Sequence, residues 1–188
     1  MADLPAWLGP LIRLEDCKDG AEKYVDYVFS FFKKDFIDSV PAFRGKHVGF
    51  DRTDDNGKPA GFTHITTETD HKTGKRVLSM RRCERIGWIR AIIEHADDPA
   101  VLMWEKEHFT PRRVTNRIYL FLECDNFVVI IEEKKKGYYM ITAIFVDSPK
   151  QKAKHLKAYE EYHKAKKEAA KQETAQKGGS RARFTVGK

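Results

Sequence analysis

The sequence lacks several features that would assign it to a familiar class. No apolar run approaches the roughly 20 residues that a membrane-spanning helix needs. The first residues contain an early Asp3 and no basic stretch, so they do not resemble a secretory signal peptide. The cysteines are Cys17, Cys83 and Cys124, and their odd number and wide spacing predict neither a disulfide framework nor a zinc site. These absences favour a cytoplasmic protein with no membrane partner.

Motifs for metals and cofactors are also missing. No Cys-x-x-Cys or His-x-x-x-His spacing is available to hold zinc, and no glycine-rich loop is available to cradle a nucleotide phosphate. The chain contains no internal repeat. We therefore expect no metal and no cofactor, and any chemistry would come from the side chains themselves.

Positive charge is abundant but unevenly distributed. The 188 residues include 35 Lys and Arg against 28 Asp and Glu, for a net charge of +7. Residues 149–188 account for +8 of this, so residues 1–148 contribute −1. Within that nearly neutral body, residues 72–90 hold seven basic residues against one acidic residue, and Arg112, Arg113 and Arg117 form a second group. Local basic patches are the electrostatic signature of a polyanion partner.

Helical periodicity appears in three segments. Apolar residues of 20–38 recur at the spacing of one helix face, and residues 79–95 show the same pattern. The predicted core face of the second helix is formed by Ile86, Ile89 and Ile93. Residues 149–176 are rich in Ala, Lys and Glu, which predicts a basic C-terminal helix, and residues 177–188 are typical of a flexible basic tail.

Strand patterns dominate the middle of the chain. Three β-rich runs at 115–123, 127–133 and 138–146 are separated by short turns, which predicts consecutive antiparallel strands. Alternation in "FTHIT", residues 62–66, predicts a fourth strand, followed by a loop. Residues 1–148 should therefore form an α+β domain in which N-terminal helices pack on a four-stranded, mainly antiparallel sheet, with a C-terminal helical extension.

One histidine precedes the arginine-rich helix. His64 is a candidate general acid or base because an imidazole titrates near neutral pH. Arg81 and Arg85 are four residues apart on one helix face, so both planar guanidinium groups could reach one phosphate. The structural alternatives are a histidine on a sheet surface and a solvated helix face whose arginines pair with acidic residues.

Other candidate side chains have an equally simple structural alternative. Trp88 shares the arginine face and suits either stacking on a base or filling a gap against the sheet. On the last predicted strand, Tyr138 and Thr142 should point the same way. Their hydroxyls would then line a site, unless both side chains pack in the core or at the sheet edge.

The segments "FRGKHV", "GKPAGFTHITTE", "RRCERIGWIRAIIE", "RIYLFLE" and "FVVIIEEKKKGYYMITAIFV" together resemble a group of phage- and prophage-encoded proteins of the BECR superfamily, which joins barnase, EndoU, colicin and RelE nucleases. The resemblance covers about residues 43–160. It implies metal-independent RNA cleavage, often by a toxin, through a histidine, a basic residue and a hydroxyl on a late strand. The catalytic residues it implies here are His64, Arg81, Arg82, Arg85 and Thr142.

The implied chemistry uses the 2′-hydroxyl of RNA as the nucleophile and leaves 2′,3′-cyclic phosphate ends. His64 would act as base or acid, and the arginines would stabilise the crowded phosphorane. RNA, for example tRNA or another structured RNA, is the expected partner, and an antitoxin or immunity protein would be a second. The residues expected to bind nucleic acid are Trp88, Arg112, Arg113, Arg117 and Tyr138.

Two further classes stay open: a noncatalytic nucleic-acid-binding protein, and a phage interaction protein whose basic surface meets an acidic partner. A cleft converging on His64, Arg85 and Thr142 would favour the nuclease. A flat basic surface would favour the binding protein, and an exposed apolar patch would favour the interaction protein.

Overall fold

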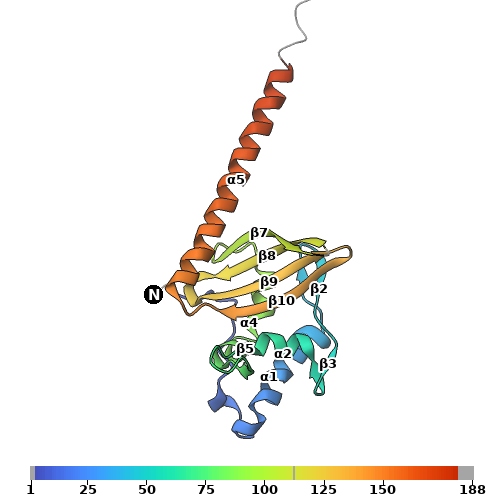
Figure 1. Ribbon diagram of the computed structural model, residues 1–188, viewed down its shortest axis with the longest axis vertical. Coiled ribbons are helices and arrows are strands. Elements are labelled where there is room, and N and C mark those ends of the chain that lie inside the picture. Colours follow the sequence, from blue (N-terminus) through green and yellow to red (C-terminus); the bar gives the residue numbers. More distant parts are fainter. Residues whose placement is uncertain (1–2, 112, 182–188) are drawn as a thin grey trace, which may run out of the picture.

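A mixed six-stranded sheet forms the centre of the molecule, between a layer of short helices and one long helix (Figure 1). The computed structural model describes residues 3–111 and 113–181. The strand order is β1-β2-β10-β9-β8-β7. β2 runs parallel to β10, and the other neighbouring strands are antiparallel. The chain therefore has an α+β fold, but its sheet has six strands where the sequence predicts four.

The first predicted helix is confirmed. It comprises α1, Tyr24–Phe32, and a π-helical turn, Lys33–Ile37, that continues it. Val28, Phe32 and Phe36 are buried in the main core, as their spacing predicts. Two short 3₁₀ helices, Leu14–Asp16 and Ala21–Lys23, precede it.

The predicted meander of three antiparallel strands is also confirmed, as β8, Arg113–Leu122; β9, Phe127–Lys134; and β10, Gly137–Phe145. A further strand, β7, Val101–Thr110, precedes it and pairs with β8. A short 3₁₀ helix, Glu123–Asp125, joins β8 to β9. The middle strand β9 is covered on both faces, because Val129 and Ile131 pack in the main core while Val128 and Ile130 pack under the C-terminal helix.

The strand predicted at residues 62–66 is a helix. α2 spans Ala60–Thr66, and its buried Phe62, Ile65 and Thr66 follow a helical rather than an alternating spacing. The hydroxyl of Thr66 donates to the carbonyl of Phe62 at 2.8 Å, which supports the helical turn. The segment following α2, predicted to be a loop, includes a hairpin of β5, Thr67–Thr69, and β6, Arg76–Leu78.

The sheet gains its extra strands from two other parts of the chain. β1, Ala42–Phe43, and β2, Lys46–Gly49, form one edge, and β2 pairs with the start of β10. β7 forms the opposite edge. A separate small hairpin consists of β3, Asp54–Asp55, and β4, Lys58–Pro59.

The single helix predicted at residues 79–95 is two helices. α3 spans Met80–Glu84 and α4 spans Trp88–Glu94, and the chain turns at Arg85, whose backbone leaves the helical conformation. The predicted core isoleucines are confirmed as buried: Ile86, Ile89 and Ile93.

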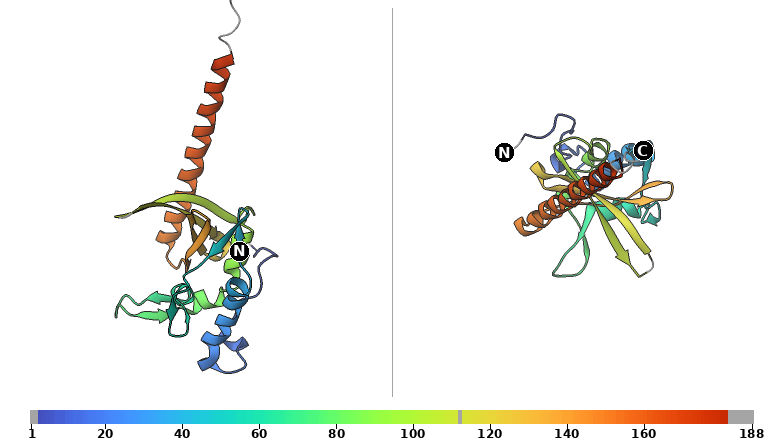
Figure 2. Two further views of the ribbon diagram at one scale, coloured as in Figure 1. Left: turned by 90° about the vertical axis from the view of Figure 1, so that its right-hand side faces the viewer. Right: turned by 90° about the horizontal axis from the view of Figure 1, so that it is seen from above.

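The C-terminal helix α5, Pro149–Arg181, crosses the sheet face opposite the short helices and continues well beyond it (Figure 2). Its 33 residues span about 50 Å. Leu156, Tyr159 and Tyr162 pack on the sheet, whereas each described side chain after His163 is exposed. The helix passes the predicted boundary at residue 176, and residues 182–188 of the predicted tail lie outside the described residues. None of the described helices is both long and apolar enough to cross a membrane.

Candidate nucleic-acid interface

His64 lies at the surface of α2 rather than on a strand of the sheet. Partial burial of its ring, with help from the charges of Arg76 and Arg82, holds the pKa of the imidazole below its usual value. The carbonyl of His64 accepts a hydrogen bond from Arg76 at 3.0 Å. His64 is therefore close to two cations, as the sequence suggests, although Arg76 was not among the predicted catalytic residues.

Those two cations use their donors mainly on the protein itself. Arg76 donates to the carbonyls of His64 and Thr67, and Arg82 donates to the same Thr67 carbonyl at 2.8 Å. The Nε atom of Arg82 also lies 3.7 Å from the Glu68 carboxylate. Both arginines thus hold the β5–β6 hairpin against α2 and α3, which is a structural role.

Arg85 is buried and paired. Only 8% of its side chain is exposed, and its guanidinium forms hydrogen bonds with both carboxylate oxygens of Asp125. A further donor binds the Arg81 carbonyl at 2.9 Å, and the guanidinium lies over the rings of Phe145 and Trp88. Arg85 therefore joins the α3–α4 turn to the β8–β9 turn. It is not exposed to a phosphate, contrary to the catalytic role predicted for it.

Arg81 is the exposed member of the predicted group. Its side chain is 62% exposed, lies over the ring of Phe145 and is 3.7 Å from the Asp147 carboxylate. A groove beside it is lined by His71, Lys72, Arg82 and Asp147, but not by His64 or Arg81. This groove thus does not bring the predicted histidine and arginines together.

Thr142 lies on the opposite side of the sheet from α2. A β-bulge interrupts β10 between Met140 and Thr142, after which Thr142 is directly opposite Ile130 of β9. Ile130 belongs to the apolar cluster under α5, and opposite residues of an antiparallel pair share a face. Because the bulge inserts one residue, Thr142 no longer points the same way as Tyr138, contrary to the prediction.

Two of the predicted nucleic-acid contacts are core residues. Trp88 is buried, and its indole nitrogen donates to the Gly9 carbonyl at 2.7 Å. Tyr138 is buried against Phe43, with the ring centroids 4.8 Å apart. Both side chains therefore pack in the core, which was the alternative to nucleic-acid binding. Arg112 lies outside the described residues.

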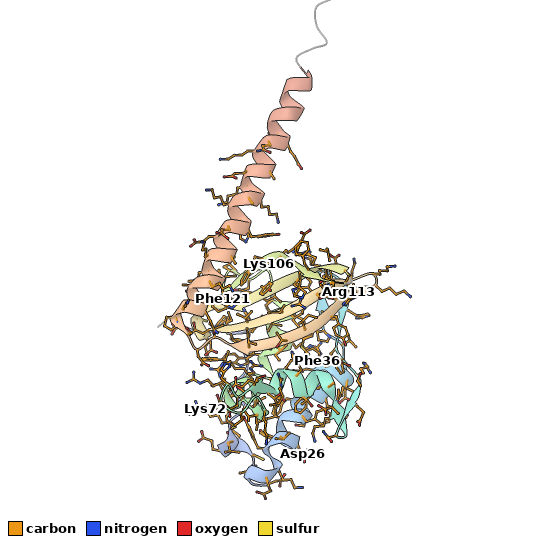
Figure 3. All side chains as sticks on the ribbon, viewed as in Figure 1. Asp26, Phe36, Lys72, Lys106, Arg113 and Phe121 are labelled. Atoms are coloured by element: carbon orange, nitrogen blue, oxygen red, sulfur yellow. The ribbon has the colours of Figure 1, made fainter. Side chains whose placement is uncertain are left out.

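Arg113 and Arg117, in contrast, lie on one face of β8 together with other cations. In the register of the sheet, Arg117 is opposite Lys106 of β7 on one side and Glu132 of β9 on the other. Two-residue periodicity places Arg113 and Lys134 on the same face. We call this surface the basic sheet face; its members are Lys106, His108, Arg113, Thr115, Arg117, Glu132, Lys134 and Tyr139. In Figure 3, Lys106 and Arg113 lie on the upper strands, whereas Lys72 lies below the sheet.

Glu132 organises the basic sheet face. Its side chain is 3% exposed and accepts hydrogen bonds from Thr115 at 3.0 Å, Arg113 at 3.2 Å and Arg117 at 3.3 Å, and also from Lys134. Burial alone would raise the pKa of this carboxyl, but the hydrogen bonds from Lys134 and Thr115 and the charge of Lys134 outweigh it, so the pKa is lowered. One carboxylate thus holds three cations in place, and the surface keeps a positive excess.

The opposite face of the same strands carries acidic residues. Glu105, Glu107 and Glu133 alternate with the basic residues along β7 and β9 and therefore point the other way. Near the tip of the β7–β8 hairpin, Phe109 and Val114 form an exposed apolar pair on this acidic face. Basic residues thus lie on one face of these strands and acidic residues on the other.

The sequence patterns do not single out Lys106, Glu132 and Lys134. A usable signal was present, because Arg113, Thr115 and Arg117 have the two-residue spacing of one strand face. The predicted strand began at residue 115, so the arginines were treated as a local cluster rather than as part of a sheet surface.

Among residues 3–111 and 113–181, no three His, Cys, Asp or Glu side chains come together in an arrangement that would hold a metal ion. Comparisons of the chain with protein-family models, with curated proteins and with solved structures found no match.

Proposed function

We propose that this protein binds RNA on the basic sheet face. The observation that carries the proposal is the contact of Arg113, Arg117 and Lys134 with the single carboxylate of Glu132, with Lys106 directly opposite Arg117. With His108 counted as neutral, the four cations and one carboxylate sum to +3, although residues 1–148 sum to −1. A local excess of this kind attracts a polyanion without requiring a basic protein overall.

The geometry of the surface suits an extended phosphate chain. β7 and β8 are ten residues long, and their basic side chains are spaced at alternate positions along them. Arginine side chains offer planar donors that match phosphate oxygens. The exposed lysines of α5 begin on the same side of the sheet and add positive charge next to this surface.

The test is fluorescence anisotropy with a labelled single-stranded RNA at several salt concentrations. We expect Lys106→Ala and Arg113→Ala each to weaken binding, and each lost phosphate contact to reduce the salt slope by about 0.7. Arg81→Ala is the matched control, since it removes an equally exposed arginine from the other side of the sheet. Absence of RNA binding by the unaltered protein would refute the proposal. Loss of binding only in Arg81→Ala would indicate that the RNA interface is on α3.

A second candidate function, metal-independent RNA cleavage, is favoured by one observation. His64 is at the surface beside Arg76 and Arg82, and its lowered pKa leaves the imidazole neutral at pH 7 and able to accept a proton. The resemblance to BECR nucleases points to the same residue. In this proposal one segment of the RNA would bind the basic sheet face, and another segment of the same RNA would reach His64.

Cleavage is tested on labelled RNA in the presence of EDTA. His64→Ala should lower the cleavage rate by roughly 10²–10⁴-fold while RNA binding persists. The products should end in 2′,3′-cyclic phosphates, and a 2′-deoxy substitution at the scissile nucleotide should block the reaction. If the protein binds RNA and leaves it intact, the binding function stands alone.

A further inference from the structure

A groove on the helical side of the molecule has no role in the proposed RNA interface. It lies between the extended N-terminal segment and α1, with a volume of about 690 Å³. This is within the range of small-molecule sites, which are usually ~300–1,000 Å³. Its apolar lining residues belong to the main core cluster or pack against it, namely Leu11, Ile12, Tyr27, Phe31 and Trp88, so the sheet separates the groove from the basic sheet face.

The walls of the groove are mostly apolar and aromatic. Tyr27 and Phe31 of α1 contribute two rings in an edge-to-face arrangement, with centroids 5.2 Å apart. Leu11 and Trp88 line the other side. The Trp88 indole is fixed by its hydrogen bond to the Gly9 carbonyl, which also lines the groove. A rigid aromatic wall of this kind favours a flat or cationic ligand.

Charged residues also line the groove: Arg13, Glu15, Asp16 and Lys34 are exposed, whereas Asp35 is half-buried and supplies the specific polar group. It lies in the π-helical turn Lys33–Ile37, a local geometry that is common at functional sites. Its carbonyl accepts a hydrogen bond from Arg90 at 3.3 Å, and the residue lines the groove. Burial raises the pKa of this carboxyl despite the opposing charges of Arg90 and Lys34. Within residues 3–111 and 113–181, no side chain donates a hydrogen bond to the carboxylate or forms an ion pair with it.

We propose that this groove binds a small organic cation, namely a protonated amine attached to an aromatic or apolar body. The ammonium group would donate to the Asp35 carboxylate, and the body would lie against Tyr27 and Phe31. A half-buried carboxylate with no donor gains more from a cationic ligand than an exposed one does, because water solvates it less well. The neighbouring aromatic faces attract the same charge.

The experiment uses the full chain and amide NMR spectra recorded during titration with benzylamine, which is protonated at pH 7. Benzyl alcohol serves as a neutral probe of the same shape. We expect benzylamine to shift the amide signals of residues 9–13 and of α1 in a saturable way, and benzyl alcohol to bind at least tenfold more weakly. Asp35→Asn should weaken benzylamine binding by about tenfold or more, since a charge-assisted hydrogen bond is lost.

Two variants keep the test specific. Asp38→Asn removes an exposed carboxylate that pairs with Lys33 and does not line the groove, so it should leave benzylamine binding unchanged. Asp35→Glu keeps the charge and should retain part of the affinity. Equal binding of benzylamine and benzyl alcohol would overturn the proposal. So would an unchanged affinity in Asp35→Asn, or shifts confined to the acidic face of the β7–β8 hairpin.

Discussion

Replacing Arg85 by alanine should destabilise the fold rather than remove a catalytic cation. The substitution deletes the hydrogen bonds to the Asp125 carboxylate, whose side chain is only 18% exposed, and the contacts with Phe145 and Trp88. Removing one partner of a buried ion pair costs about 3–5 kcal/mol. This is a large part of a typical total stability of about 5–15 kcal/mol. In a chain of this length it corresponds to a fall in Tm of roughly 6–20 °C.

The assay is denaturant unfolding of the unaltered protein, Arg85→Ala, Asp125→Ala and the double variant. Because Arg85 and Asp125 share one interaction, the double variant should lose less stability than the two single losses combined. Arg81→Ala is the control, since an exposed arginine should change stability by no more than about 0.5 kcal/mol. The reasoning fails if Arg85→Ala unfolds at the same denaturant concentration as Arg81→Ala.

Four further outcomes can be measured on the same protein. Gly137→Ala would place a Cβ atom 2.6 Å from the His47 carbonyl oxygen, where β2 meets β10. The free energy of unfolding, measured by thermal melting, should therefore fall by about 1–3 kcal/mol. Burial, with a smaller contribution from a neighbouring lysine, lowers the pKa of His155, so the unfolded chain binds the proton more readily. Stability should therefore fall as the pH drops below about 6.5, and His155→Phe should flatten that slope in melts from pH 7.5 to 5.5. Glu132→Ala leaves three partly exposed cations without their carboxylate and should lower the free energy of unfolding by about 1–3 kcal/mol in urea. Deleting residues 177–188 should leave the Tm unchanged, because the described side chains of α5 from residue 164 to residue 174 are already exposed, but should weaken RNA binding at low salt in the anisotropy assay.

The parts of the fold that the sequence predicts are those encoded by local periodicity. The meander and α1 have long patterns, and a run of five apolar residues at the start of β9 identifies a strand covered on both faces. The segment 62–66 is too short for that kind of evidence. Phe62 and Thr66 fit a strand face and a helix face equally well, and only the burial of Ile65 instead of His64 distinguishes them.

The parallel contact between β2 and β10 has no local signal. It pairs Val48 with Tyr138 and Gly49 with Tyr139, residues far apart in the chain. Residues 46–50, with the sequence KHVGF, suit a short strand, but the sequence does not show which strand they would join. The prediction of a four-stranded sheet therefore failed at this tertiary contact as well as at the misread local pattern of residues 62–66.

The candidate site shows a different limit. Counting arginines locates positive charge, but the count does not reveal where the donors of each side chain go. Arg82 donates to a backbone carbonyl and Arg85 to a buried carboxylate, so little of their charge faces solvent. Arg113 lies in a shorter and less conspicuous cluster, yet 59% of its side chain is exposed. Exposure, which depends on the whole fold, decides which cluster can meet a phosphate.

The separation of charge on the β7–β8 hairpin depends on strand register. Arg117 shares a face with Lys106 because the two residues are directly opposite, and Glu105 and Glu107 lie on the other face for the same reason. A slip of one residue would move the β8 arginines to the acidic side and abolish the positive excess. At the tip of the hairpin, the Thr110 hydroxyl donates to the Arg113 carbonyl at 2.8 Å and accepts from its amide at 3.1 Å. These two bonds oppose such a slip, so a single threonine at the turn helps to keep the basic sheet face basic.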